Sequence, residues 1–181
     1  GARLVGVMGA QPADVVATLA RGAGLDVVQL HADPTADDVV AVRRAWDGEL
    51  WAVLRVAGTV LPAHLVDLFA VADAVVLDAK VEGAQLGGTG VALAWAELAE
   101  AVHAVRGQTP LVLAGGLRPE NVATAVRALA PDVVDVSSGV EASPGVKDPA
   151  RMAAFAAAVA GAVADAVARA LAGAGDDARP A

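Results

Sequence analysis

Residues 111–122 read LVLAGGLRPENV and contain one complete structural unit. Leu111–Ala114 is a short, unbroken apolar run, which is typical of a parallel strand covered on both faces. Gly115 and Gly116 follow as a turn, and Pro119 introduces a helical pattern, in which proline favours the first turn. The stretch therefore predicts a strand, a tight turn and a helix in that order.

The same unit recurs along the chain. The predicted strands are Leu4–Met8, Val27–Leu30, Trp51–Val56, Ala74–Leu77, Leu111–Ala114 and Val133–Val136. The predicted helices are Pro12–Gly22, Thr35–Trp46, Leu61–Ala72, Ala94–Val105, Pro119–Ala130 and Asp148–Ala170. Strict alternation of this kind allows either an open doubly wound sheet or a closed (β/α)8 barrel.

Two features favour the barrel. The turn after the first strand, Gly9-Ala10-Gln11, lacks the glycine-rich dinucleotide fingerprint. Glycine gathers instead after the last three strands, and the phosphate site of a barrel usually follows strands seven and eight. We therefore predict an α/β fold, a (β/α)8 TIM barrel that lacks its first two βα units and keeps strands three to eight. It would occupy residues 1–172, with a disordered tail over 173–181.

Composition narrows the range of functions. The 181 residues are 56% hydrophobic, which suffices for one buried core. Lys and Arg number 13 against 21 Asp and Glu, and the net charge of −8 argues against nucleic acid and anionic membranes as partners. Because the chain has no cysteine, it offers no disulfide, thiolate metal site or cysteine nucleophile. His31, His64 and His103 are not spaced as ligands, so we expect no metal.

The two ends of the chain carry further expectations. Met152–Leu171 is long enough to cross a membrane, but its alanine content and the Asp165 and Arg169 pair predict an amphipathic helix instead. Gly1 stands where Met would begin a protein, and no signal peptide precedes the first strand. We expect a cytoplasmic protein whose chain here begins inside a domain. The unpaired edge strands of an incomplete barrel would favour self-association.

Two neighbouring loops are candidates for a phosphate site. Gly115 and Gly116 lie between a strand and a helix, and Ser137, Ser138 and Gly139 add hydroxyl groups one unit later. Glycine lets backbone N–H groups turn toward an anion. Either loop alone is equally compatible with a tight turn that holds no ligand. Their succession at one end of a barrel favours a shared phosphate pocket.

Two carboxylates also end predicted strands. Asp78 follows an apolar run, where partial desolvation favours the protonated form and suits a general acid, although a loop-anchoring role is also compatible. Asp135 holds a similar position on the last strand and is a candidate for binding or orienting a substrate. Arg55, near the end of its strand, could face the same site.

A glycine-rich stretch lies beyond Asp78. It consists of Gly87, Gly88, Thr89 and Gly90. Such a stretch suits either a lid over a ligand or a plain flexible connection.

Seven motifs together resemble a known family. They are VGVM (5–8), VQLH (28–31), VLDA (76–79), GGTG (87–90), LAGGLRPENV (113–122), DVSSGVE (135–141) and PGVKD (144–148). In order and spacing, from residue 3 to about residue 160, they resemble phosphoribosylanthranilate isomerase. The last three motifs are the most specific.

The resemblance implies a TIM barrel that catalyses an Amadori rearrangement in tryptophan biosynthesis without metal or organic cofactor. The substrate would be the small phosphosugar N-(5-phosphoribosyl)anthranilate. By resemblance, Asp78 is the general acid, Asp135 lies near the anthranilate amine, and the Gly115-Gly116 and Ser138-Gly139 loops bind phosphate.

The chain also departs from the family. The family's cysteine base and carboxylate-binding arginine belong to the first two units, which have no counterpart here, so we expect this chain alone to be inactive. One alternative is a non-catalytic sugar-phosphate-binding remnant or paralogue. Another is a different phosphate-binding barrel isomerase, such as one of histidine biosynthesis, against which the DVSSGVE motif argues.

Overall fold

A computed structural model describes residues 1–56, 58, 60–79 and 90–176. Six parallel strands form one sheet in chain order, as the sequence predicts. They are β1 (Val5–Met8), β2 (Val27–Leu30), β3 (Glu49–Val56), β4 (Ala74–Ala79), β5 (Leu111–Ala114) and β6 (Val133–Val134). Each pairs in parallel with the next, so their carboxyl ends meet along one edge.

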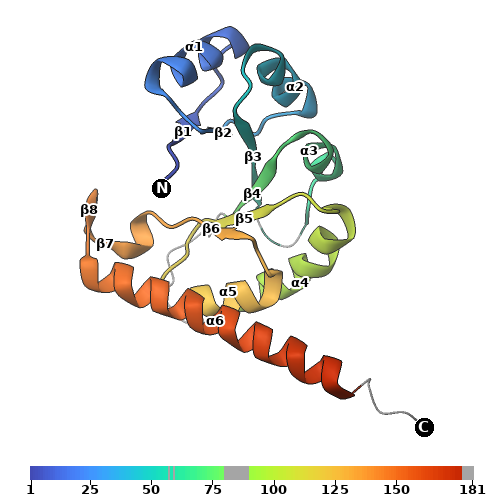
Figure 1. Ribbon diagram of the computed structural model, residues 1–181, viewed down its shortest axis with the longest axis vertical. Helices are drawn as coiled ribbons and strands as arrows, with labels where there is room; N and C mark the ends of the chain where they lie inside the picture. Colours follow the sequence, from blue (N-terminus) through green and yellow to red (C-terminus); the bar gives the residue numbers. More distant parts are fainter. Residues whose placement is uncertain (57, 59, 80–89, 177–181) are drawn as a thin grey trace.

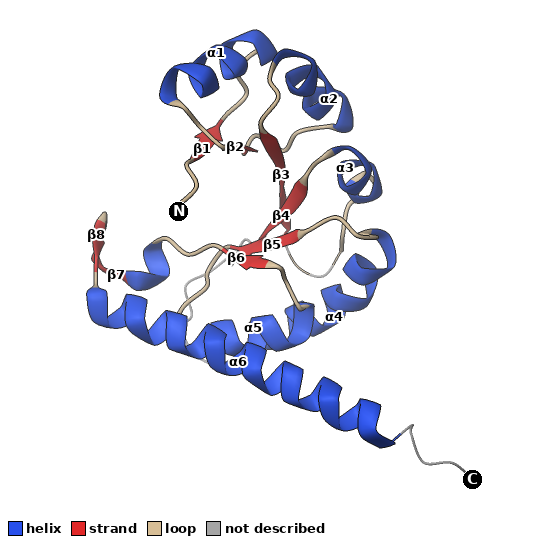
Figure 2. Cartoon of the chain, viewed as in Figure 1, coloured by secondary structure: helices blue, strands red, loops and turns tan. Residues whose placement is uncertain are grey.

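Helices lie outside this sheet. They are α1 (Ala13–Ala23), α2 (Ala36–Ala45), α3 (Leu65–Val71), α4 (Gly90–Val105), α5 (Val122–Leu129) and α6 (Pro149–Asp176). Figure 1 shows the sheet curling, with the helices around its outer side. The same view coloured by element type shows the six strands of this sheet inside the ring of helices (Figure 2). The described chain is thus a partial (β/α) barrel.

Aspartates at the amino ends of alternate strands join neighbouring strands. Asp26, Asp73 and Asp132 each immediately precede a strand, β2, β4 and β6 respectively. Their side-chain Oδ2 atoms accept from the backbone N–H groups of Leu4, Leu50 and Leu111, at 2.7, 2.7 and 2.8 Å. Each bond ties a strand to its predecessor, so it helps to fix the parallel register.

Both faces of the sheet are largely buried along β2 to β5, which explains the nearly continuous apolar runs of these strands. One cluster lies between the strands and the helices and includes Val28, Leu50, Leu77, Leu98 and Leu113. A smaller cluster comprises Val53, Ala74, Val76, Val112 and Ala114. Side chains alternate along each strand, so the smaller cluster fills the inner face of the curl.

Helix starts follow from capping. Thr35 and Asp38 form a reciprocal capping box at α2. The predicted Asp148 cap is confirmed, because its Oδ1 accepts from the N–H groups of Ala150 and Arg151 at 2.8 and 3.3 Å. The predicted starts of α3, α4 and α5 need correction.

Three helix starts and one end differ from the prediction. α5 begins at Val122 rather than Pro119, because Asn121 bonds back to the N–H of Arg118 and holds a turn. α3 begins four residues after the predicted Leu61, beyond the turn containing Pro62. α4 begins early, at Gly90, and α6 continues to Asp176, since alanine-rich sequence sustains a helix. Helix α6 thus runs four residues into the segment predicted as a tail, and residues 177–181 lie outside the described part.

The segment after β6 contains structure that the sequence did not predict. β6 ends at Val134 rather than Val136. A short 3-10 turn, η1 (Ser138–Val140), follows, and then β7 (Glu141–Ser143) and β8 (Val146–Lys147) form an antiparallel hairpin. The hairpin turn contains Gly145 at φ 78°, a backbone conformation that favours glycine.

Helix α6 passes a length and composition test for a membrane span over Pro149–Ala172. In the structure it packs along α5 and contributes Phe155 and Ala162 to the core. This packing supports the predicted amphipathic helix of a barrel.

Strand β1 lies at one end of the sheet order and pairs only with β2 among the described strands. Its Val7 side chain is 64% exposed.

An exposed apolar edge strand favours association between molecules. We therefore predict that the chain forms oligomers and that Val7→Lys shifts them toward monomer. Sedimentation velocity checks this. Val66→Lys, on the exposed side of α3, is the matched control and should change nothing; a monomeric parent chain would contradict the prediction.

Candidate active site

A pocket of about 230 Å³ opens at the carboxyl ends of β2, β4, β5 and β6. This is the edge at which barrels build their active sites. The lining residues are Gln29, His31, Val76, Asp78, Ala114, Gly115, Gly116, Leu117, Asp135, Val136, Ser137, Ser138 and Gly139. The structure thus brings together the predicted pair of carboxylates and both predicted phosphate loops.

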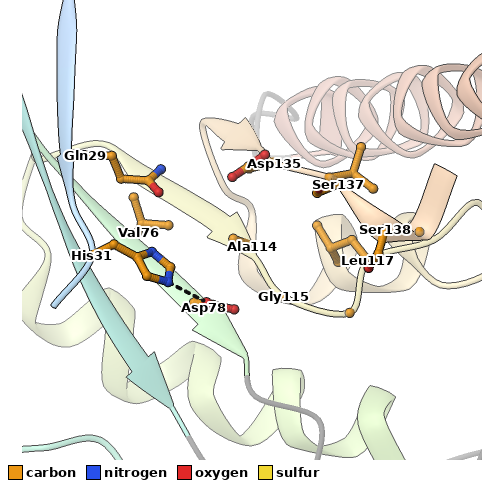
Figure 3. A pocket seen from close by; sticks show the side chains of 13 residues that line it. Gln29, His31, Val76, Asp78, Ala114, Gly115, Leu117, Asp135, Ser137 and Ser138 are labelled. Carbon is orange, nitrogen blue, oxygen red and sulfur yellow. Dashed lines mark ion pairs between the residues drawn. The ribbon is translucent and has the colours of Figure 1, made fainter. Parts of the chain in front are cut away.

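Asp78 has a neighbour that sequence reasoning left without a role. His31 Nε2 lies 3.8 Å from Asp78 Oδ2, and the two side chains are 40% and 26% exposed. Figure 3 shows this pair on one side of the pocket, with Asp135, Ser137 and Ser138 on the other. His31 Nδ1 is buried and has no hydrogen-bond partner within the described residues. An imidazole beside a carboxylate can hold or exchange a proton, so the pair can perform acid–base chemistry.

The position of His31 in the sequence could have identified it as a residue of the pocket. It directly follows β2, so parallel pairing brings it to the same edge as Asp78 at the end of β4. The backbone N–H of His31 donates to Met8 O at 2.8 Å, which holds this strand end in place. Gln29, two residues earlier, points into the pocket and is the one buried polar side chain among the described residues.

The two glycine loops touch each other. Gly115 and Gly116 have φ of 83° and 62°, which strongly favours glycine at these positions. A Cβ atom on Gly139 would lie 1.8 Å from the carbonyl oxygen of Leu117, so only glycine fits there. This contact joins the loop after β5 to the loop after β6 as one wall of the pocket.

Side chains outside the pocket hold two carbonyl groups of this wall. Asn121 Nδ2 donates to Gly116 O at 3.0 Å, while Asn121 Oδ1 accepts from Arg118 N at 2.8 Å. Lys147 Nζ donates to Ser137 O at 2.9 Å. Among the described residues, no backbone carbonyl accepts from the N–H groups of Leu117, Ser138 and Gly139. Backbone N–H groups without a protein acceptor are candidate donors to an anion.

The remaining predicted residues divide into two groups. Asp135 lines the pocket, and its backbone N–H donates to Leu113 O at 2.8 Å. Of the predicted lid, Gly87, Gly88 and Thr89 lie outside the described residues. Gly90 is the first residue of α4, so its backbone is helical rather than part of a loop.

Arg55 does not line the pocket. Its Nε atom donates to Asp33 Oδ1 at 2.9 Å, and Nη2 also contacts this carboxylate. Hydrogen bonding from Arg55 lowers the pKa of Asp33. Arg55 therefore forms an ion pair with Asp33 outside the pocket.

Fold and pocket define a partial (β/α)-barrel protein whose carboxyl edge carries an imidazole–carboxylate pair opposite a wall of two glycine loops. The family model for N-(5′-phosphoribosyl)anthranilate (PRA) isomerase matches residues 1–158. The chain belongs to this family.

Individual relatives agree with this assignment. N-(5′-phosphoribosyl)anthranilate isomerase of Haloferax volcanii is 44% identical over 139 residues, which is 77% of this chain and 60% of that protein. The crystal structure of phosphoribosyl anthranilate isomerase from Thermotoga maritima superimposes with a TM-score of 0.72 at 28% identity, over 88% of this chain and 73% of that one. A further structure, of this isomerase with reduced 1-(o-carboxyphenylamino)-1-deoxyribulose 5-phosphate, gives 0.71 at 26% identity, over 88% and 72%. The chain spans about 60% of the length of the first curated relatives it matches.

The Gly139 contact makes a stability prediction. Gly139→Ala would push a methyl group into the Leu117 carbonyl, and we expect a loss of about 1–3 kcal/mol in the free energy of unfolding, as for overpacking. Gly161→Ala, in α6 with nothing within 4 Å of the added Cβ, should have no cost or a small gain. Denaturant unfolding of both variants checks this, and equal stability of the two would contradict the close contact.

Proposed function

We propose that the chain supplies the general acid and the phosphate site of a phosphoribosylanthranilate isomerase, which acts in cytoplasmic tryptophan biosynthesis. The observation that carries the proposal is the pocket itself, where Asp78 faces the wall formed by the two glycine loops. A related enzyme was crystallised with reduced 1-(o-carboxyphenylamino)-1-deoxyribulose 5-phosphate, a ligand with the carboxylate, amine and phosphate of the proposed product. The substrate would be N-(5-phosphoribosyl)anthranilate.

The six strands would correspond to strands three to eight of a complete barrel. With that alignment, Asp78 ends strand six, and the two anion-binding loops follow strands seven and eight. Barrel enzymes commonly bind phosphate at those last two loops. The alignment therefore accounts for the position of the pocket at one side of the curl.

The proposed reaction needs one acid and one base. Asp78 donates its proton to the ring oxygen of the ribose while the C1′–O bond breaks, and an iminium forms with the anthranilate nitrogen. A base then removes the C2′ proton to give an enolamine, which tautomerises to the 1-deoxyribulose ketone. His31, 3.8 Å from the Asp78 carboxylate, would act on it electrostatically, and Asp135 would orient the anthranilate amine.

A second function is favoured by one observation. The family's base is a cysteine, and this chain has none. The chain alone would then bind the phosphosugar without converting it, either as the portion of the enzyme that carries the acid or as a non-catalytic sugar-phosphate-binding protein. Both functions share the pocket, and they differ in what happens when a base is supplied.

The test supplies the base. The chain is fused behind the first two βα units of the Haloferax volcanii relative, and isomerase turnover is measured with N-(5-phosphoribosyl)anthranilate. We expect turnover in the fusion, and a loss of roughly 10²–10⁴-fold with Asp78→Asn, which removes the general acid. Asp67→Asn, an exposed carboxylate on α3, is the control and should keep full activity.

The two functions give different results. A folded fusion that binds the reduced product but shows no turnover would favour the non-catalytic binding protein. A chain that binds neither this ligand nor any sugar phosphate in calorimetry would contradict both functions.

A further inference from the structure

Lys147 reaches back from the β7–β8 hairpin to the phosphate loop. Its Nζ atom lies 2.9 Å from Ser137 O, 3.3 Å from Ser137 Oγ and 2.8 Å from Glu141 Oε1. These three acceptors match the three protons of the ammonium group. Lys147 does not line the pocket, whereas Ser137 does. The ammonium group therefore lies behind the loop and binds it from the side away from the ligand.

The bond to Ser137 O determines where the next amide points. Carbonyl and N–H groups of one trans peptide point in opposite directions. Because Lys147 draws the Ser137 carbonyl toward the hairpin, the N–H of Ser138 is turned the other way, toward the pocket that Ser137 and Ser138 line. The N–H of Val140 also donates to Ser137 O at 3.4 Å and supports the same orientation.

The hairpin holds Lys147 in place. Glu141 is 15% exposed, and hydrogen bonding from Lys147 lowers the pKa of its carboxyl group, which favours the carboxylate that accepts from Lys147. Arg151 Nη1 donates to Glu141 O at 2.8 Å, and Asp148 N donates to Val140 O at 2.8 Å. These bonds tie both hairpin strands to the start of α6 and to η1.

The preceding loop uses the same principle. There the side chain of Asn121, also outside the pocket, holds Gly116 O, so the N–H of Leu117 is turned the opposite way. Two side chains of different chemistry thus orient one peptide in each loop. In both loops, therefore, a side chain outside the pocket hydrogen-bonds a backbone carbonyl and so orients the peptide that follows it.

The geometry points to Lys147 as a positioning residue for phosphate: it tethers the Ser137 carbonyl so that the Ser138 amide faces the anion, without contacting the anion itself. This inference rests on the proposed phosphate-binding function. It assigns to the GVK part of the PGVKD motif a role within the binding site, where sequence alone gave only a resemblance.

The test measures affinity for inorganic phosphate and ribose 5-phosphate by calorimetry with the 181-residue chain. We expect Lys147→Met to weaken both ligands at least tenfold, because the Ser137–Ser138 peptide is free to rotate. Lys147→Arg, which can still donate to Ser137 O, should stay within about threefold of the parent. Arg44→Met, on α2 outside the pocket, removes the same charge and should change nothing.

Ionic strength separates positioning from simple attraction. The Debye length shrinks from about 10 Å at 0.1 M salt to about 3 Å at 1 M, so a long-range charge effect fades in salt whereas a lost amide donor does not. We expect the ratio of dissociation constants between Lys147→Met and parent to persist at 0.5 M salt. A ratio that collapses to one in salt, or an affinity unchanged by Lys147→Met, would overturn the inference.

Two further outcomes are distinguishable. If Lys147→Met does not fold, Glu141→Gln serves instead: it loosens the ammonium group and should weaken phosphate binding measurably, and unchanged affinity would overturn the inference. If the parent chain itself binds neither ligand, the proposed function fails together with the inference that rests on it.

Discussion

The parallel register of the six strands is the constraint on which the site depends. Asp26, Asp73 and Asp132 help to fix it at the amino ends of three strand pairs, where each carboxylate accepts from a backbone N–H at or next to the start of the preceding strand. Register at one end of a parallel sheet sets position at the other. His31 and Asp78, on strands that are not adjacent, therefore meet across the pocket at a distance of 3.8 Å.

The negative charge of the protein explains why backbone N–H groups, rather than cationic side chains, would serve as the phosphate donors. The chain carries a net charge of −8, and its pocket contains two carboxylates, so an incoming phosphate meets an acidic protein. The wall offers neutral backbone N–H groups from Leu117, Ser138 and Gly139. Such groups attract an anion without adding a cation that would pair with Asp78 or Asp135. Lys147, which does not line the pocket, is bonded to Ser137 and Glu141 behind this wall.

Most of the fold could be predicted from the sequence because a buried parallel strand leaves a clear signature. The predicted bounds of Val27–Leu30 and Leu111–Ala114 are confirmed to the residue, since each is a short run that is apolar except for Gln29. The helix starts at Leu65 and Val122 differ from the prediction because local turns precede them, one closed by Leu65 N–H on Pro62 O and one by Arg118 N–H on Asn121 Oδ1. The β7–β8 hairpin was missed because strands of two or three residues carry no periodicity.

For the candidate site, too, some features could be predicted from the sequence and others could not. Glycines and carboxylates at strand ends could be placed from the sequence, because parallel topology alone brings them to one edge. The partners of those residues could not. The contact of His31 with Asp78, and that of Lys147 with Ser137, join residues whose side-chain directions depend on the curl of the sheet and on an unpredicted hairpin. Arg55 shows the converse, since a basic residue at a strand end pairs with Asp33 and stays out of the pocket.

The central claim is that the two joined loops bind phosphate through their backbone amides. Amide chemical shifts in a ¹H–¹⁵N spectrum of the chain, recorded during titration with inorganic phosphate, test it most directly. The account predicts that the largest shifts fall on Leu117, Ser138 and Gly139 and follow one saturable curve. An unchanged spectrum, or shifts confined to residues of α1 and α2, would contradict it.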